Sequence, residues 1–433
     1  MKKLVPVLAC WLVALPCLAE IALPLRVGVS RVSINPMEAQ IPTQLGGYGA
    51  REGKPAIGTL DTIYGKVLLF DNDREKSALI TVDICSVPIC LVEETLANAK
   101  IEGLTLDRTL VTASHSHTGL EGYALDRRNV ANNPNIGIFS ELMLNFVTDR
   151  LSEALRLADA ALQNVKAGSS AIDLPGMNRN RRGNRPLDTQ MTVLRLDTIG
   201  GAPLAVLVNY TAHGTFVDET DMLVSGEWAG SMQRAVEDLI GGGVTCFYTN
   251  GAEGDVSPVG VDAGSHYEKA QNYGRQIGVA AARLAEAIPT SPVNAYAVRN
   301  AWVTLPERKA APDFVKIAGE EYKVTQEDID TMVTVLFPEK APVYALRING
   351  FQLMSFPGEP IGEIGLKVKE TLRAAGIATP CVAALTTDQI GYILTKEEYA
   401  KSGYEVTASF YGDGLGALLT DEVCKLGTAV ATE

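Results

Sequence analysis

The sequence predicts an α/β protein with a mixed β-sheet core flanked by helices and a functional site at the loops that follow strands. Short apolar runs alternate with longer segments of helical periodicity along most of the chain. Hairpin signals such as Asn349-Gly350 join some neighbouring runs, so part of the sheet is expected to be antiparallel. Hydrophobic residues make up 46% and charged residues 21% of the 433 residues, a composition typical of globular rather than disordered chains.

The N-terminus has the pattern of a secretory signal. Two lysines precede an apolar run from Leu4 to Leu15, and the small residue Ala19 suits cleavage before Glu20. This run is too short for a stop-transfer helix, and no later stretch approaches the roughly 20 apolar residues of a membrane span. We therefore expect residues 1–19 to be a signal peptide, residues 20–433 to form a single catalytic domain, and the mature protein to be secreted or periplasmic.

Charge and cysteine content narrow the choice of partners. The formal net charge is −13, and removal of residues 1–19, which carry two lysines and no acid, would leave −15. This balance argues against nucleic acid or an anionic membrane surface as a partner. No CxxC zinc knuckle is present, so any zinc is expected on nitrogen and oxygen ligands. The odd number of cysteines after residue 19 leaves their disulfide pairing open; they are Cys85, Cys90, Cys246, Cys381 and Cys424.

In the first half of the chain, extended apolar patterns predict strands and one long segment has clear helical spacing. The turn residues Asp71-Asn72-Asp73 separate two of the strands, and glycine-rich residues 44–50 are expected to form a loop. Leu142, Phe146 and Leu151 mark one face of the long helix. The expected strands are 20–35, 62–71, 77–84, 109–113, 191–196 and 204–210, and the expected helices are 92–100 and 139–162.

The second half repeats this alternation, with three segments of a different character. The basic stretch 177–186 and the stretch 250–258 are expected to be loops, and the polar residues 309–328 an insertion or lid. From Thr395 the pattern is mixed. The expected strands are 244–249, 293–305, a hairpin over 344–356 and 381–386, and the expected helices are 225–240, 267–288 and 361–374.

Three of the four histidines follow predicted strands. His115 and His117 lie in VTASHSHTG, and His213 lies in TAHGT. If the first strand stays extended through Ser114, both of its imidazoles face the same side. One histidine at such a position is usually structural, but three at strand ends indicate a zinc site, since neutral imidazole is a preferred zinc ligand.

Four further residues at loops are candidates for the same site, each with a structural alternative. Glu359, in SFPGEP, is a candidate ligand or a helix cap. Tyr392, in TTDQIGY, is a candidate ligand or a packing residue. Ser257, in NGAEGDVSP, faces substrate or forms a turn, and Arg179 lies among four arginines that are mostly expected to be solvated. His266, at a helix start, is interpreted as structural.

Five motifs together resemble the family of neutral (alkaline, non-lysosomal) ceramidases. In chain order they are SHSHTG, YTAHGT with VSGEWAG, NGAEGDVSP, FPGEP and IGYILTKEEYAKSGYE, which span roughly residues 25–412. Val259 follows GDVSP where the family usually has asparagine. The family members also carry a C-terminal immunoglobulin-like domain, which is expected to be absent here because the motifs end close to Glu433.

The resemblance implies one zinc per chain and a catalytic role for several of the candidates. Carried over residue by residue, His115, His213, Glu359 and Tyr392 bind the metal, and Tyr392 is also counted among the catalytic residues. The second histidine, His117, and Arg179 face the substrate and the developing charge. Ser257 is implied to be catalytic or to bind substrate.

The expected activity is therefore hydrolysis of the N-acyl bond of ceramide, or of a related small N-acyl lipid, to a fatty acid and a free sphingoid base. Two imidazoles, a carboxylate and a phenol leave one zinc position open, as a catalytic zinc requires. Three enzyme alternatives remain, namely a zinc esterase or lactonase, an N-acyl amino acid amidase, and a serine amidase built on Ser257. The alternative of another class is a secreted lipid-binding protein without activity.

Overall fold

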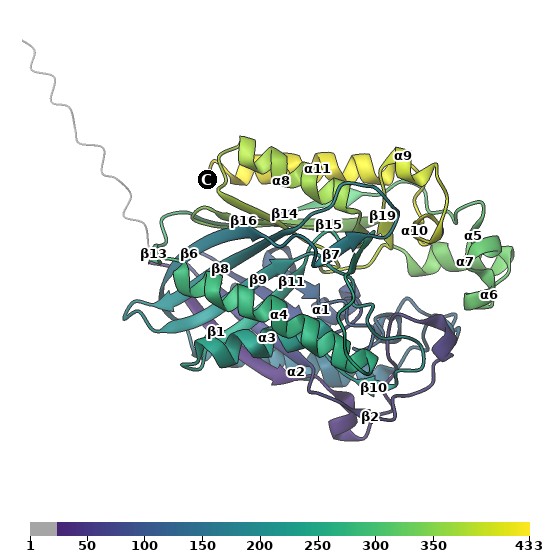
Figure 1. Ribbon diagram of the computed structural model, residues 1–433, viewed down its shortest axis with the longest axis horizontal. Helices are drawn as coiled ribbons and strands as arrows, with labels where there is room; N and C mark the ends of the chain where they lie inside the picture. The colour runs from purple at the N-terminus through teal and green to yellow at the C-terminus, as the bar shows by residue number, and fades with distance from the viewer. Residues whose placement is uncertain (1–23) are drawn as a thin grey trace, which may run out of the picture.

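Two β-sheets pack face to face, and helices cover the outer face of each sheet (Figure 1). The computed structural model describes residues 24–433, so the predicted signal peptide lies outside the described residues. Apolar side chains from both sheets meet in a shared core, for example Leu68 and Phe247 from the larger sheet with Leu346 and Leu353 from the smaller one. The predicted α/β class with a mixed sheet is confirmed.

The larger sheet is mixed, because most of its neighbouring strands are antiparallel but the pairs β4–β5 and β9–β11 are parallel. Its strand order is β11-β9-β8-β6-β1-β3-β4-β5, with β13 beside β6. The parallel pairs lie at its two edges. Its strands are β1 Arg26–Ser33, β3 Tyr64–Asp71, β4 Lys76–Val82, β5 Thr109–Ala113, β6 Gln163–Asp173, β8 Gln190–Thr198, β9 Pro203–Tyr210, β11 Thr245–Asn250 and β13 Ser291–Pro292.

The smaller sheet contains the hairpin that the Asn349-Gly350 signal predicts. Asn349 has a positive φ of 52°, as a tight hairpin turn requires, and Ile348 pairs with Phe351 across it. The fourth strand adds in parallel to the hairpin. The strands, in sheet order, are β14 Tyr296–Thr304, β15 Lys340–Ile348, β16 Phe351–Ser355 and β18 Thr379–Ala383.

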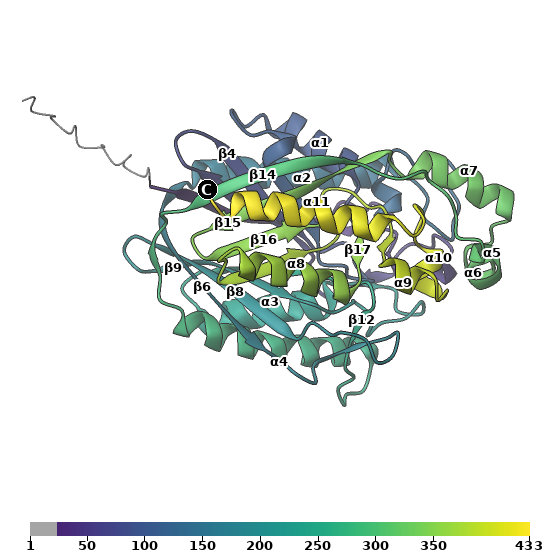
Figure 2. The same ribbon diagram turned by 90° about the horizontal axis from the view of Figure 1, so that it is seen from above.

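Helices complete the outer layers, as Figure 2 shows for α8 and α11 over the smaller sheet. Each predicted helix is present within a few residues of its expected bounds, but α11 was not predicted. Its small residues and scattered polar residues give only a weak helical periodicity in the sequence. The helix is stabilised by packing on the sheet. The helices of the outer layers are α1 Ile89–Ala99, α2 Glu141–Ala160, α3 Glu227–Ile240, α4 His266–Ala287, α8 Gly362–Ala374 and α11 Leu415–Val430.

Short elements surround the ends of the strands. The predicted loops 177–186 and 250–258 each contain a short strand, and these strands pair with each other, so the loop prediction is wrong at these positions. The expected lid segment, 309–328, contains two short helices and the start of a third, which continues to Leu336. No helix of the described residues is long and apolar enough to cross a membrane. The short elements are β2 Gly58–Thr59, β7 Asn178–Asn180, β10 Leu223–Val224, β12 Val256–Pro258, β17 Glu359–Pro360, β19 Tyr392–Ile393, α5 Phe314–Ile317, α6 Gly319–Tyr322, α7 Gln326–Leu336, α9 Lys396–Tyr399, α10 Tyr404–Thr407, η1 Pro36–Ala39, η2 Gly49–Arg51, η3 Leu106–Arg108 and η4 Tyr123–Leu125.

The segment after β18 draws the ends of the two sheets together. Ala384 N–H donates to Asn250 O at 3.0 Å, at the end of β11. Ala113 N–H, at the end of β5, donates to Leu385 O at 3.2 Å. These bonds bring the ends of β5, β11 and β18 to one place, where the loops that carry the predicted site residues also meet.

Candidate metal centre and active site

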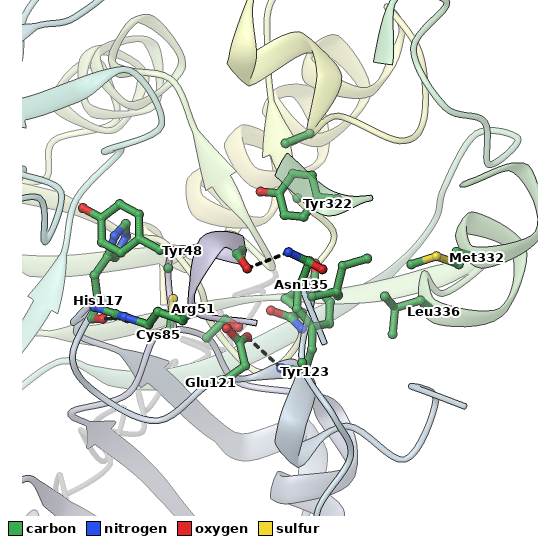
Figure 3. A pocket seen from close by; sticks show the side chains of 18 of the residues that line it. Tyr48, Arg51, Cys85, His117, Glu121, Tyr123, Asn135, Tyr322, Met332 and Leu336 are labelled. Carbon is green, nitrogen blue, oxygen red and sulfur yellow. Dashed lines mark hydrogen bonds between the residues drawn. The ribbon is translucent and has the colours of Figure 1, made fainter. Parts of the chain in front are cut away.

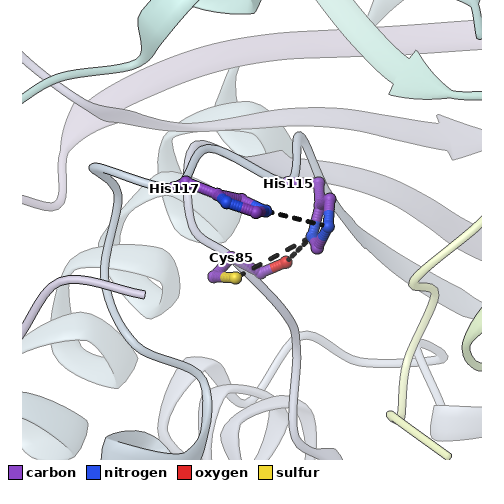
Figure 4. A group of neighbouring side chains, drawn as sticks. All are labelled: Cys85, His115 and His117. Carbon is purple, nitrogen blue, oxygen red and sulfur yellow. Dashed lines mark hydrogen bonds between the residues drawn. The ribbon is translucent and has the colours of Figure 1, made fainter. Parts of the chain in front are cut away.

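The two histidines of the SHSH motif meet by a turn and not by strand alternation. Strand β5 ends at Ala113 and His115 has a positive φ of 63°, so strand alternation does not account for the shared direction of the two imidazoles. A non-glycine residue in this conformation is uncommon and turns the chain sharply. The imidazoles of His115 and His117 nevertheless face each other, with their Nε2 atoms 3.2 Å apart (Figure 4).

Four of the predicted residues converge around one point. Glu359 Oε2 lies 3.6 Å from His115 Nε2 and 3.2 Å from His213 Nε2. The hydroxyl of Tyr392 lies 3.2 Å from the same nitrogen of His213. Strands β17 and β19, which begin with Glu359 and Tyr392, pair in parallel and hold these two residues opposite each other. Residues from both sheets thus form one buried cluster.

The donor set fits a metal ion. Nδ1 of His115 lies 2.8 Å from Cys85 O, and Nδ1 of His213 lies 2.9 Å from Glu253 O. Each ring is assigned the tautomer that donates Nδ1–H to the carbonyl, which leaves the Nε2 lone pair free. Glu359 Oε2 is buried and forms no hydrogen bond within residues 24–433. His115 Nε2, His213 Nε2 and Glu359 Oε2 therefore lie close enough together to hold a metal ion.

Burial and neighbouring charge set the protonation of this cluster. Burial, with the nearby Arg181, lowers the pKa of His213 to about 4. Burial and the neighbouring His115 lower the pKa of His117 well below its usual value. Both rings are therefore neutral near pH 7. Burial alone would raise the pKa of Glu359, but His115 and His213 lower it overall, so this carboxylate is ionised.

Tyr392 behaves differently in the chain without metal. Burial and the carboxylate of Glu359 raise the pKa of its phenol well above the usual value. Arg181 acts in the opposite direction, because Nη2 donates to the Tyr392 hydroxyl at 2.9 Å. A bound cation would act in the same direction as Arg181.

The arginine that reaches the cluster is Arg181, two residues beyond the predicted one. Arg179 lies on β7 with its side chain exposed, and no hydrogen bond or ion pair joins it to the cluster within the described residues. Arg181 follows β7, where the chain turns inward, and its guanidinium is held by Glu405 at 2.8 Å and by Gly254 O at 2.8 Å. Both arginines stand in one arginine-rich motif, and its sequence does not distinguish them.

Ser257 lies beside the cluster without joining it. It is buried on β12, opposite Arg179 of β7. Its neighbour Val256 accepts a hydrogen bond from His213 N–H at 3.0 Å, so β12 supports the His213 loop. Among residues 24–433, no hydrogen bond joins the Ser257 hydroxyl to a histidine. A serine nucleophile needs such a base in reach, so this geometry does not favour a serine amidase.

A pocket opens on the cluster and is polar at one end and apolar at the other. Figure 3 shows His117 and Cys85 at one end, with Met332 and Leu336 at the other. The expected lid, 309–328, contributes Phe314 of α5 to the apolar end, and the part of α7 beyond residue 328 contributes Ile329, Met332 and Leu336. We call the side that holds His115, His117, Glu359 and Tyr392 the metal end. The apolar end consists of Phe314, Ile329, Met332, Leu336, Phe337 and Phe410.

Other residues of the site were not predicted from the sequence. The ring of Tyr404 lies 6.0 Å from that of Tyr392, and its hydroxyl lies 3.1 Å from that of Tyr322. Tyr404 stands in the IGYILTKEEYAKSGYE motif and Tyr322 in the expected lid, but neither tyrosine was assigned a role from the sequence. Cys85 lines the pocket with Sγ 3.8 Å from His115 Nδ1, and all five cysteines after residue 23 are free. The structure therefore contains no Cys85–Cys90 disulfide.

The comparisons with known proteins agree with the motif resemblance. No protein-family model matches the chain. The neutral ceramidase of Mycobacterium tuberculosis (strain ATCC 25618 / H37Rv) is 20% identical over 476 residues, which cover 89% of this chain and 74% of that protein. The crystal structure of neutral ceramidase from Pseudomonas aeruginosa has a TM-score of 0.77 at 20% identity, covering 95% of this chain and 75% of that one. A structure described as ceramidase complexed with C2 has a TM-score of 0.78 at 18% identity, covering 95% and 76% of the two chains. The predicted resemblance is confirmed, and the chain has the neutral ceramidase fold.

Proposed function

We propose that the protein is a zinc-dependent amidohydrolase that cleaves the N-acyl bond of ceramide or a related N-acyl lipid. The products are a fatty acid and a sphingoid base or similar amine. The observation that carries this proposal is the convergence of His115, His213, Glu359 and Tyr392 at one end of a pocket whose other end is apolar. The relatives that carry the name ceramidase support the same substrate class.

One zinc ion would be held by the two Nε2 atoms, the carboxylate and the phenol of these four residues. A bound zinc supplies a Lewis acid that polarises the scissile carbonyl and lowers the pKa of water toward about 7. The carbonyls of Cys85 and Glu253 keep the two ligand imidazoles in the tautomer that presents Nε2. Glu359 contributes the negative charge that a divalent ion requires.

His117 is proposed to move the proton. Its Nε2 lies next to the metal ligand His115, and the neutral ring can accept a proton from the attacking water. The same nitrogen then returns the proton to the leaving amine. General acid–base catalysis of this kind needs the ring within hydrogen-bond reach of both groups, and His117 lines the same pocket as His115, Glu359 and Tyr392.

Arg181 is proposed to stabilise negative charge on the reacting oxygen, the role that the sequence assigned to Arg179. Its guanidinium is fixed by Glu405 and by Gly254 O, and it reaches the phenol of Tyr392. A donor that is already in place when charge develops contributes more than one that must reorient. Tyr404 stands beside Tyr392 and is proposed to orient the amide.

The apolar end is proposed to bind a hydrocarbon chain of the substrate. Its aromatic and aliphatic side chains offer no hydrogen-bonding group to a head group, and burial of methylene groups there is favourable. This arrangement also serves a lipid ester, so a zinc esterase remains the second candidate on the same residues. Secretion to the outside of the cell or to the periplasm is proposed from the N-terminal sequence pattern alone.

The test is a panel of substrates with and without a chelator. We expect purified protein to hydrolyse N-acyl sphingosine, to lose this activity with a chelator and to regain it with zinc. A pair of substrates that differ in the head-group hydroxyl sharpens the assignment, because a site built for a hydroxyl rejects its analogue by up to about 10,000-fold. Faster turnover of matched esters than of amides would favour the esterase. Activity that persists in the presence of a chelator would contradict the proposed dependence on a metal.

A further inference from the structure

The three clustered imidazoles are held in two different ways. His115 and His213 are oriented by their Nδ1–H bonds to the carbonyls of Cys85 and Glu253. Nδ1 of His117 is buried and makes no hydrogen bond within the described residues. Apart from the contact between its Nε2 and that of His115 at 3.2 Å, the position of the His117 ring is set by its main chain and by packing.

A buried arginine and a buried carboxyl side chain hold the main chain of His117. Its N–H donates to Glu227 Oε2 at 2.6 Å, and its carbonyl accepts from Arg51 Nη1 at 2.5 Å. A hydrogen bond donated by a charged guanidinium is shorter and stronger than a neutral one, while burial raises the pKa of the Glu227 carboxyl to about 8. Arg51 is 3% exposed and Glu227 is 1% exposed, so neither bond is weakened by solvent. We call Arg51 and Glu227 the His117 clasp.

Arg51 joins His117 to two neighbouring segments. Its guanidinium also donates to Gly46 O, to Asp218 O at 2.9 Å and to Asp221 O at 3.0 Å. It forms no ion pair with a carboxylate within residues 24–433. A planar guanidinium with several fixed donors sets the relative positions of the groups it binds, which a lysine cannot do.

Glu227 adopts a strained backbone conformation that directs its carboxylate to His117. It is the first residue of α3 and has a positive φ of 49°, which is unusual for a buried residue with a Cβ. Its N–H donates to Ser225 Oγ at 2.9 Å. The carboxylate accepts from His117 N–H rather than capping its own helix, which has no side-chain cap. Such strain tends to persist where function requires it.

Packing completes the support of the ring. The Tyr48 ring contacts the His117 ring edge to face at 5.1 Å and 77°. Gly47, with a φ of +88°, lies so close that a Cβ there would overlap the imidazole. A small residue is needed at this position because the backbone itself forms the wall behind the ring.

We propose that Arg51 and Glu227 are positioning residues for His117. They hold its main chain on both sides so that Nε2 stays beside the metal end, and they contribute to kcat through His117. This inference rests on the role of His117 in the proposed function. A purely structural role for the same pair is the alternative, and the two make different predictions.

The kinetic test uses Arg51→Met and Glu227→Ala in the zinc-loaded protein. Small displacement of a catalytic group can cost about 100-fold in rate, so we expect a kcat loss of that order with KM and zinc content unchanged. The milder variants Arg51→Lys and Glu227→Gln should fold, and Gln should recover much of the loss because it still accepts from His117 N–H. In a His117→Ala background the same changes should cost no further activity, and an equal further loss would overturn the proposal.

Matched controls separate the clasp from general effects of losing a buried charge. Glu237 lies on the same helix and its carboxylate also accepts from a main-chain N–H, that of Cys246, at 2.9 Å. Arg195 is a partly buried arginine that donates to Ala285 O at 3.0 Å, away from the pocket. Glu237→Gln and Arg195→Met should lower thermal stability but leave kcat unchanged.

A spectroscopic readout tests the clasp without relying on activity. The chain has four histidines, so imidazole ¹⁵N signals of labelled protein can be assigned with a His117→Ala variant. We expect Glu227→Ala and Arg51→Lys to shift or broaden the His117 signals, Glu227→Gln to change them least, and the His213 signals to stay in place in all three variants. Unchanged His117 signals would overturn the clasp. If the signals respond but the wild type hydrolyses no N-acyl substrate, the proposed function fails and the clasp stands.

Discussion

The metal end and the apolar end of the pocket differ in the contacts that hold their side chains in place. At the metal end, imidazoles, carbonyls and charged groups meet at hydrogen-bonding distances. At the apolar end, α5 and α7 contribute aromatic and aliphatic side chains without directional bonds between them. The first arrangement suits chemistry at one point, and the second suits a flexible hydrocarbon chain. We therefore expect substitutions at the metal end to change kcat and substitutions at the apolar end to change chain-length preference.

Loss of a metal ligand should give the largest effect. His115→Ala and His213→Ala each remove an Nε2 donor from the cluster, and we expect both proteins to lose the metal and to fall to background activity. Metal content by mass spectrometry of the folded variants is the measurement. A variant that keeps stoichiometric zinc would remove that histidine from the ligand set.

His117→Ala should leave the metal in place but slow the reaction. General acid–base groups typically contribute about 100- to 10,000-fold, and we expect a kcat loss in this range with zinc content unchanged. Steady-state kinetics and metal analysis of the same sample provide the comparison. Metal loss equal to that of His115→Ala would show that His117 is a ligand and that its catalytic role is assigned wrongly.

The arginine pair offers an internal control. Arg181→Met removes the guanidinium beside Tyr392, and we expect about a 100- to 1,000-fold loss of kcat, as for other preorganised donors. Arg179→Met, two residues away and exposed, should be indistinguishable from the wild type. The reverse result would restore the assignment made from sequence.

The apolar end should respond through substrate length. Leu336→Ala removes several methyl and methylene groups from the wall, at about 0.8 kcal/mol per buried CH₂. We expect KM to rise about tenfold for a long-chain N-acyl substrate, while kcat/KM for an acetyl analogue stays the same. Equal loss for both substrates would indicate a general packing defect, to be checked by thermal unfolding.

Glu121, which lines the pocket beside Tyr123, should give the smallest effect. Burial raises the pKa of its carboxyl to about 7, above the ordinary value of about 4.3. The folded state therefore holds this proton more tightly than the unfolded chain, and the stabilisation present below about pH 4 is lost as the pH rises through about 7. Melting curves should show the wild type losing a few degrees relative to Glu121→Gln between about pH 5 and 8. Parallel curves would show that the Glu121 carboxyl has an ordinary pKa.

The residues of the metal end were predicted from the sequence better than those of the apolar end. His115, His213, Glu359 and Tyr392 stand in short motifs with unusual residue types, and these motifs are visible without tertiary structure. The turn at His115 was not predictable, because its positive φ is imposed by contacts such as the bond from its N–H to Ile84 O. The apolar end combines Phe314 of the polar segment 309–328 with residues from 329–337 and the distant Phe410, and these meet only in three dimensions.

Arg181 and the His117 clasp show what could not be predicted from the sequence. Arg179 and Arg181 share one motif, and which of them turns inward depends on where β7 ends. Arg51 and Glu227 lie 66 residues before and 110 residues after His117, and no local pattern connects them to it. Long-range pairings of this kind follow from the packing of the two sheets and the loops between them.

The most direct test of the central claim is a zinc titration of the metal-free protein with amide hydrolysis as the readout. The account predicts that the rate of N-acyl sphingosine cleavage rises in proportion to bound zinc and saturates at one zinc per chain. A hydrolysis rate that is independent of bound zinc would contradict it.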